Sequence, residues 1–361
     1  SHRTNGLPLE EETIAEVFKT NGYRTAAIGK WHLGSRDEQH PNNRGFDLFY
    51  GMKAGGRDYF YNEKKSDRPG DERNLLLNDR QVKFEKYLTD AFSEKAVEFI
   101  NESSQPFMMY LAYNAVHTPM QATDEDMAKF EGHPRQKLAA MTYALDRGVG
   151  TVIRGLKDSG KFDNTLIFFL SDNGGATTNQ SSNYPLKGFK GNKFEGGHRV
   201  PYFVVWKNGI PAGKPYDGLV SSLDIFATAI DAASISKTRN RLDGVSLLPY
   251  LKGKKGEPHK VLYWRKMDTR AIRSGDYKLI ITHGVDSVLY NIRRDPEEMN
   301  NLINKEPDLY RKLAKKLAKW EKNECIEPSW LEEGWRKITN RYHQQLMHNE
   351  IKTAQDLYKK K

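Results

Sequence analysis

The sequence predicts an α/β fold: a mostly parallel sheet flanked by helices, followed by a small antiparallel sheet with a helix. Along residues 9–206, segments with helical spacing of apolar residues alternate with short apolar segments, as in an α/β domain. The short segments are apolar throughout, which is typical of strands covered on both faces of a parallel sheet. Beyond Gly253 the chain changes to short segments separated by turn residues, which predicts the antiparallel sheet.

The elements of the larger part can be assigned in order. Apolar residues spaced three or four apart predict the helices, and the apolar run TLIFFL is the clearest buried strand. The helices are expected at 9–22, 89–100 and 136–156, and the strands at YRTAAIG (23–29), PFMMYLAY (106–113), TLIFFL (165–170) and YFVVW (202–206).

The smaller part begins after a basic stretch with Gly and Pro, KGKKGEP (252–258), which suits a linker. The expected domains are therefore residues 1–253, an α+β subdomain at 254–325 and a helical tail at 326–361. The antiparallel strands are expected at KVLYW (260–264), TRAIRSG (269–275), YKLII (277–281) and SVLYNI (287–292), and a helix at 307–322.

Composition narrows the classes of partner. Lys and Arg number 57 against 47 Asp and Glu, a net charge of +10, which favours polyanionic partners. No nucleic-acid-binding pattern appears, so nucleic acid is not expected. No apolar run approaches the ~20 residues of a membrane span. The single cysteine, Cys325, excludes an intrachain disulfide and is interpreted as a structural or incidental thiol.

Chemically useful side chains follow the predicted strands. Lys30 and His32 come where the first strand ends, and in extended backbone they would share a face with Trp31 turned away. A solvated loop is the alternative. Asp172 and Asn173 follow TLIFFL and offer oxygen ligands that suit calcium or magnesium. An Asx turn would explain them equally well.

Two further segments lie in comparable places. His117 follows PFMMYLAY, and the glycine-rich segment 186–201 carries Lys187, Lys190, Lys193 and Arg199 just before YFVVW. Each segment alone also has a structural interpretation, as a structural histidine or a solvated loop. Sites in α/β sheets form at the carboxyl ends of strands, so the common placement of all four favours one functional site.

Six motifs together resemble the type I sulfatases of the alkaline-phosphatase superfamily. The resemblance covers about residues 1–325, is nearest to the arylsulfatase and N-acetylgalactosamine-sulfatase branch, and implies an alkaline-phosphatase-like fold. The motifs are, in order, GYRTAAIGKWHLG, HPNNRGFDLFYG, HTP, SDNGG, KGFKGNKFEGGHRVP and LDGVSLLPYLKG.

The resemblance implies roles for individual residues. Asp172 and Asn173 match the family's ligands of a divalent cation, usually calcium, with magnesium as the alternative. Lys30 and His32 match the pair that contacts the nucleophile, a formylglycine hydrate.

His117 and Lys190 match residues that bind the sulfate and help the leaving oxygen depart. The implied activity is hydrolysis of sulfate esters in sulfated saccharides or aryl sulfates, in a protein exported to the periplasm, the exterior or the lysosome. Arg57, in GGRDYFYN (55–62), is a candidate partner for a second sulfate or a uronate, with a surface arginine as the alternative. Competing functions are a non-catalytic binder of sulfated glycans and a phosphodiesterase or phosphonate hydrolase.

Two family features are missing from the sequence. The nucleophile motif C/S-x-P-x-R and the N-terminal Asp-Asp metal pair do not occur, and Cys325 lacks the required spacing. Residues 1–6 resemble the stretch after the nucleophile helix, and we expect the signal region to lie outside this sequence. We therefore expect a fragment, rather than a natural truncation, that is inactive by itself. The joint retention of the site residues favours the fragment.

Overall fold

The computed structural model describes residues 6–179, 181–325 and 333–359, which form two compact units. Unit 1 takes the chain up to Leu166 together with Val205–Ala212 and Ser222–Leu248. Unit 2 takes Ile167–Val204, Gly213–Ser221 and the chain from Pro249. The expected boundary after residue 253 lies close to the one after Leu248. Residues 167–204, however, group with the C-terminal part rather than with the first domain.

Unit 1 contains a central sheet with parallel strands, as the sequence predicts, but the sheet is mixed, and the predicted strands at 165–170 and 202–206 pair in a separate sheet. Its central strands are β2 (Leu48–Met52), β1 (Arg24–Lys30) and β5 (Phe107–Ala112), and β1 runs parallel to both neighbours. Two short antiparallel strands, β3 (Leu76–Leu77) and β4 (Arg80–Gln81), extend the sheet beyond β2.

Close approach of two backbones fixes the end of β1. Gly29 has φ 107°, and a Cβ there would lie 2.0 Å from the carbonyl oxygen of Ala112 in β5. Only glycine fits so near a neighbouring strand at this backbone angle. The position immediately before Lys30 is therefore set by the sheet itself.

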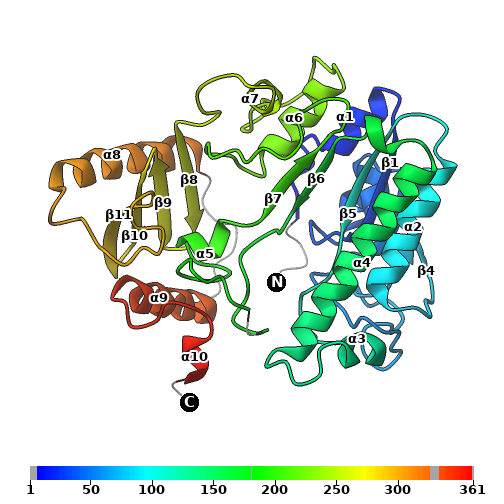
Figure 1. Cartoon of the computed structure of the whole chain (residues 1–361), viewed down its shortest axis with the longest axis horizontal. Coiled ribbons are helices and arrows are strands. Elements are labelled where there is room, and N and C mark those ends of the chain that lie inside the picture. Colours follow the sequence, from blue (N-terminus) through cyan, green and yellow to red (C-terminus); the bar gives the residue numbers. More distant parts are fainter. Residues whose placement is uncertain (1–5, 180, 326–332, 360–361) are drawn as a thin grey trace. The chain divides into compact units, whose positions relative to one another are not determined.

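The predicted helices of unit 1 are confirmed. Helix α1 (Ile14–Thr20) begins with a capping box of Thr13 and Glu16, which satisfies free backbone N–H groups at the helix start. Helices α2 (Leu88–Glu102) and α4 (Gln136–Asp158) pack side by side, and α2 also contacts the sheet (Figure 1). The remaining helices are α3 (Asp124–Ala128), α6 (Asp224–Ala232) and the 3-10 helices at Asp37–Gln39, Pro41–Arg44 and Phe162–Asn164.

Unit 2 contains the predicted antiparallel sheet, in the order β11-β10-β9-β8. Its strands alternate apolar residues toward two faces. One face packs on α8 (Pro307–Glu324) through Leu313 and Leu317, and the other packs on Phe189, Phe194 and the C-terminal segment. Figure 1 shows α8 and α9 (Glu333–Met347) beside this sheet. The strands are β8 (Val261–Lys266), β9 (Thr269–Ser274), β10 (Tyr277–Thr282) and β11 (Asp286–Asn291).

The C-terminal segment is part of this core rather than a separate tail. Leu346 and Met347 of α9 (Glu333–Met347), with Ile351 and Ala354 after it, are buried against the sheet. The first residues of the expected tail, 326–332, lie outside the described residues. The short helices α5 (Glu195–His198), α7 (Leu248–Leu251) and α10 (Asp356–Lys359) complete the list.

The run TLIFFL forms a strand but is less buried than predicted. Strand β6 (Ile167–Leu170) pairs with β7 (Tyr202–Val205) in a two-stranded sheet. Phe169 is 40% exposed, because β6 has a strand neighbour on one side only in the described part of the chain. Among the described residues, no helix is long and apolar enough to cross a membrane.

Candidate active site

The segment after β1 places Lys30 and His32 on either side of a buried tryptophan. Trp31 is 5% exposed, packs edge-to-face on Phe46, and donates its indole N–H to the Gln39 carbonyl at 3.0 Å. Lys30 is partly buried and His32 is exposed. The prediction that Trp31 turns into the packing is confirmed.

The backbone changes direction at His32, where φ is 53°. The extended geometry assumed for Lys30 and His32 therefore ends at Trp31, and their common face stays a prediction. The amide of His32 donates to the Lys53 carbonyl at 3.1 Å, so this turn lies beside the end of β2.

His117 lies in a turn after β5 that a buried tyrosine holds. The amide of His117 donates to the Asn114 carbonyl at 2.9 Å. The hydroxyl of Tyr59, a residue with no exposed surface, donates toward the carbonyls of Asn114 (2.7 Å) and His117 (3.0 Å). Burial raises the pKa of Tyr59, so its hydroxyl keeps the proton that it donates. The sequence did not indicate this role of Tyr59, because the two carbonyl groups that its hydroxyl contacts lie 55 and 58 residues later in the chain.

The nitrogen of the His117 imidazole that carries the proton can be assigned. Its Nδ1 lies 2.8 Å from the carbonyl oxygen of Thr118. Because a carbonyl only accepts, Nδ1 carries the proton in this contact. Proton exchange with another molecule is then a task for Nε2.

A pair of glycines brings His32 and His117 to one place. A Cβ on Gly55 would lie 2.7 Å from the His32 ring, and a Cβ on Gly56 would lie 3.2 Å from Nδ1 of His117. Both imidazoles thus contact the same dipeptide. Side chains at these two positions would displace the rings, which explains glycine there.

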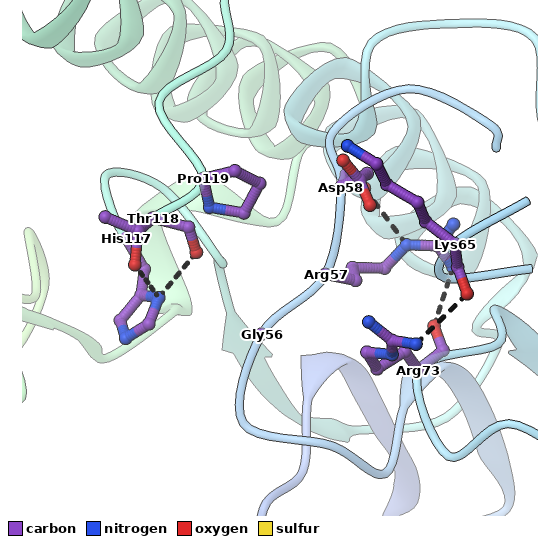
Figure 2. Close-up of a pocket in the computed structure, with 8 residues that line it drawn as sticks. All are labelled: Gly56, Arg57, Asp58, Lys65, Arg73, His117, Thr118 and Pro119. Atoms are coloured by element: carbon purple, nitrogen blue, oxygen red, sulfur yellow. Dashed lines mark hydrogen bonds between the residues drawn. The ribbon is translucent and has the colours of Figure 1, made fainter.

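Arg57 follows this pair but does not face outward. Its side chain has no exposed surface. One nitrogen donates to both oxygens of Asp67 at 2.7 and 2.8 Å. The other two donate to the carbonyls of Asp58 and Arg73, as Figure 2 shows. With all its donors directed inward, Arg57 supports the loop instead of offering a free fork to a substrate. The hypothesis that it pairs with a second sulfate is revised accordingly.

A pocket of about 390 Å³ opens beside His117, a volume within the usual range of small-molecule sites. Figure 2 shows the His117 segment on one side and the Arg57 loop on the other. The lining residues are Gly56, Arg57, Asp58, Lys65, Arg73, His117, Thr118 and Pro119.

In unit 2, Asp172 and Asn173 follow β6 at an exposed position. The Asn173 side-chain amide donates to Oδ1 of Asp172 at 2.7 Å, which directs the amide oxygen of Asn173 away from the carboxylate. A Cβ on Gly174 would lie 1.8 Å from the carbonyl oxygen of Gly196. The segment therefore packs backbone against backbone on the glycine-rich loop that carries Lys190.

Lys190 joins the same arrangement through its backbone, because its amide donates to the Gly175 carbonyl at 2.9 Å. Unit 2 thus brings Asp172, Asn173 and Lys190 onto adjoining segments. The first two supply hard oxygen donors of the kind that calcium and magnesium prefer. Among the described residues no group of three or more His, Cys, Asp or Glu could hold a metal ion. The pair fits such a cation in ligand type and would supply only part of a coordination shell.

The Lys190 loop is anchored by two aromatic residues and a buried lysine. Phe189 and Phe194 are at most 2% exposed in the core of unit 2. Lys187 has no exposed surface and donates to the Glu298 carbonyl at 3.0 Å and to the side-chain oxygen of Asn349. Burial lowers the pKa of Lys187 to about 8. Its role is structural, since its ammonium faces the protein interior.

A buried charge triad completes the anchoring. Nζ of Lys278 lies 2.8 Å from Glu195 and 3.0 Å from Glu298, and none of the three side chains is more than 2% exposed. The amide of Glu195 also donates to Glu298 at 2.6 Å. Burial raises the pKa of Glu298, whereas Lys278 lowers the pKa of Glu195 against the effect of burial. No sequence pattern indicated this triad, because its members lie on distant segments.

Known proteins were compared with this chain. A family model described as "Sulfatase" matches residues 1–235, and one described as "N-sulphoglucosamine sulphohydrolase, C-terminal" matches residues 190–323. The chain is 37% identical to the uncharacterized sulfatase YdeN of Escherichia coli, over 72% of the chain and 50% of YdeN. It is 31% identical to N-acetylgalactosamine-6-sulfatase of Canis lupus familiaris, over 76% of the chain and 55% of that enzyme.

A solved structure agrees with these matches. The crystal structure of Ps i-CgsB in complex with k-i-k-neocarrahexaose superposes with a TM-score of 0.83 and 35% identity, covering 93% of this chain and 80% of that one. The chain spans about half the length of the curated relatives it matches. The family model alone accounts for more than half of the residues. The chain belongs to the sulfatase family.

Proposed function

We propose that the protein is an exported sulfuric ester hydrolase that acts on sulfated saccharides. The observation that carries the proposal is the placement of His117, at the carboxyl end of β5 and beside a basic pocket, in a chain of this family. The similarity to a protein crystallised with k-i-k-neocarrahexaose supports a saccharide as the substrate.

His117 would give a proton to the leaving oxygen. Its Nδ1 is engaged with the Thr118 carbonyl, so Nε2 is the nitrogen that would make this transfer. The buried Tyr59 hydroxyl holds the His117 turn from behind. A fixed turn favours catalysis because the imidazole need not be ordered during the reaction.

Lys190 would contribute positive charge to the sulfate oxygens, which gain negative charge as the ester bond breaks. Its loop is anchored on both sides, by Phe189 and by the triad of Glu195, Lys278 and Glu298. Lys30 and His32 would contact the nucleophile and hold its protons. In this family pattern, formylglycine supplies that nucleophile.

A divalent cation, which we propose to be calcium, would neutralise charge on a sulfate oxygen. Asp172 would bind it through the carboxylate oxygen that Asn173 does not engage. Asn173 would add its amide oxygen once its side chain, which here donates to Oδ1 of Asp172, rotates to turn that oxygen toward the cation. A neutral second ligand keeps the site less negative toward an anionic substrate.

The proposed activity is tested by whether the protein prefers a sulfate ester or a phosphate ester. The full-length gene product, matured in a host that forms formylglycine, should release sulfate from an aryl sulfate faster than phosphate from the matching aryl phosphate. Preference for the phosphate would assign the protein to phosphoester hydrolysis instead.

The metal assignment has a readout besides activity. Added calcium should raise the melting temperature of the full-length protein, because a ligand stabilises only the state that binds it. Asp172→Ala should remove that shift, whereas Asp217→Ala, an exposed carboxylate outside the SDNGG segment, should keep it. An undiminished shift in Asp172→Ala would refute the assignment.

A further inference from the structure

The pocket beside His117 has a basic wall. Its lining includes Arg57, Lys65, Arg73 and His117 but only one acidic residue, Asp58. The Asp58 carboxylate already accepts hydrogen bonds from Ser66 (2.9 Å) and Gln121 (2.8 Å). The pocket lining therefore carries more basic than acidic side chains.

The carboxylates that balance the two arginines do not line the pocket. Arg57 is neutralised by Asp67 at a fully buried position. Arg73 donates through Nε and Nη2 to Asp71 and through Nη2 to the Lys65 carbonyl. These contacts fix the Arg73 guanidinium in a 40% exposed position, and its Nη1 has no partner among the described residues.

Lys65 is the second open donor. Its side chain is exposed and lines the pocket, and its ammonium has no hydrogen-bond or ion-pair partner in the part of the chain that the structure describes. Its backbone carbonyl accepts from Arg73, so the two residues lie on the same wall of the pocket, with the Lys65 ammonium extended toward Asp58 and the Arg73 guanidinium beside the Lys65 carbonyl (Figure 2). A guanidinium edge and an ammonium together suit an oxyanion better than a neutral hydroxyl.

We propose that Lys65 and Arg73 form a subsite for a second oxyanion, a sulfate or a carboxylate, on the sugar next to the one that loses its sulfate. This rests on the proposed function, because His117 at the other side of the pocket would act on the cleaved ester. Arg57 also lines the pocket, but its guanidinium nitrogens donate to Asp58, Arg73 and Asp67, so its part in the subsite is to support the loop. We therefore assign specificity to Lys65 and Arg73, which follow the GGRDYFYN loop, and not to Arg57 within it.

Binding measurements test the subsite independently of turnover. The full-length protein, produced without maturation of its nucleophile, is titrated by calorimetry with three hexasaccharides. These are a neocarrageenan with one sulfate per disaccharide, a neocarrageenan with two, and a chondroitin sulfate that carries uronate carboxylates. Lys65→Gln should weaken binding of at least one of the latter two by about 10-fold. Binding of the first should change less than about twofold.

The variants are chosen so that folding does not obscure the result. Lys64→Gln is the matched control, since Lys64 is the exposed neighbour that does not line the pocket. Arg73→Lys keeps the charge but loses the planar edge, and it should weaken the same ligands while the melting temperature stays within the range of the control.

The outcomes separate the two claims. A loss confined to the doubly sulfated glycan identifies sulfate as the second group, and a loss confined to the uronate glycan identifies carboxylate. Equal affinities of Lys65→Gln and the wild type for all three glycans, or no binding by the wild type, would overturn the subsite. If the matured protein released no sulfate from any of them, the proposed function would fail, and the calorimetric difference would still decide the subsite.

Discussion

In unit 1 the pocket loop is held by one buried ion pair, whereas in unit 2 the Lys190 loop is held by a lysine between two carboxylates. Arg57 meets Asp67 in a balanced pair, with no exposed surface on either side chain. Lys278 meets both Glu195 and Glu298, equally buried. Glu195 also pairs with Arg273 at 3.3 Å, whereas Lys278 is the one cation that pairs with Glu298 among the described residues. Burial raises the pKa of Glu298.

The difference predicts how the stability of each loop responds when its buried cation is removed. Removing one partner of a buried pair leaves a single uncompensated charge. Removing the shared lysine leaves two carboxylates close together and out of water. The loop of unit 2 should therefore depend more on its lysine, and more on pH, than the loop of unit 1 depends on its arginine.

The largest effect is expected for Lys278→Met. It should lower the free energy of unfolding by about 5 kcal/mol, the upper end of the range for breaking a buried pair, because Glu298 loses its cation and Glu195 keeps only its longer pairs with Arg273 and Arg199. Urea unfolding of the full-length protein measures this change. The control is Lys83→Met, since Lys83 pairs with Glu63 at 3.0 Å on the surface, where ion pairs contribute little. Similar losses in both variants would contradict the role of burial.

Arg57→Met should have the next largest effect, about 3 kcal/mol in the free energy of unfolding. It leaves Asp67 buried without its partner and frees the carbonyl of Arg73. The same urea titration applies. If the variant kept its stability but bound the glycans more weakly, Arg57 would be a substrate-binding residue. That result would contradict its assignment as a support of the loop.

A smaller effect is expected from acid in unit 2. His343 is fully buried, and its Nδ1 donates to the Thr339 carbonyl at 2.8 Å. Burial lowers the pKa of His343 to about 4, and Lys193 and Lys266 add to this shift. Because the folded-state pKa lies below the unfolded value, this contribution is complete above about pH 6.5 and is lost as the pH falls toward 4. Between pH 7 and pH 5 the loss is about 2 kcal/mol.

The comparison that isolates His343 uses His343→Asn, which keeps a donor for Thr339. Glu298 acts in the opposite sense, since its raised pKa gives stability at low pH that is lost as the pH rises through about 7. Measuring both proteins at pH 7 and pH 5 cancels this term. The wild type should lose about 2 kcal/mol more than the variant, and equal losses would remove His343 from the account.

Elements with strong local periodicity were predictable. The helices α2, α4 and α8, the strands β1 and β5 and the four strands of the antiparallel sheet follow from apolar spacing, whereas β2, β3 and β4 were missed. His117, Asp172 and Lys190 follow from their places relative to strands. The positive φ of His32 was not predictable, because nothing in its neighbours marks a left-handed turn. The direction of side chains could not be predicted either. Arg57 is an example, because its burial depends on Asp67, which lies ten residues later in a polar stretch.

Ion pairs between residues that are far apart in sequence could not be predicted either. Lys278 lies in the strand YKLII, where a single lysine is typical of a solvent-facing position. Its burial arises because the Lys190 loop brings Glu195 onto that face, 83 residues away in sequence. The exposure of Phe169 has a similar cause, since an apolar run predicts a strand but not how many neighbours the strand has.

The central claim is that His117 and Lys190 serve cleavage of a sulfate ester, and the turnover number tests it most directly. The measurement is kcat for sulfate release by the matured full-length protein at saturating substrate, in wild type, His117→Gln and Lys190→Gln. Lys312→Gln, at an exposed position of α8, serves as the control. We predict that kcat falls roughly 100-fold or more in each of the first two variants and stays unchanged in the third. A kcat within a few-fold of wild type for both His117→Gln and Lys190→Gln would contradict the account.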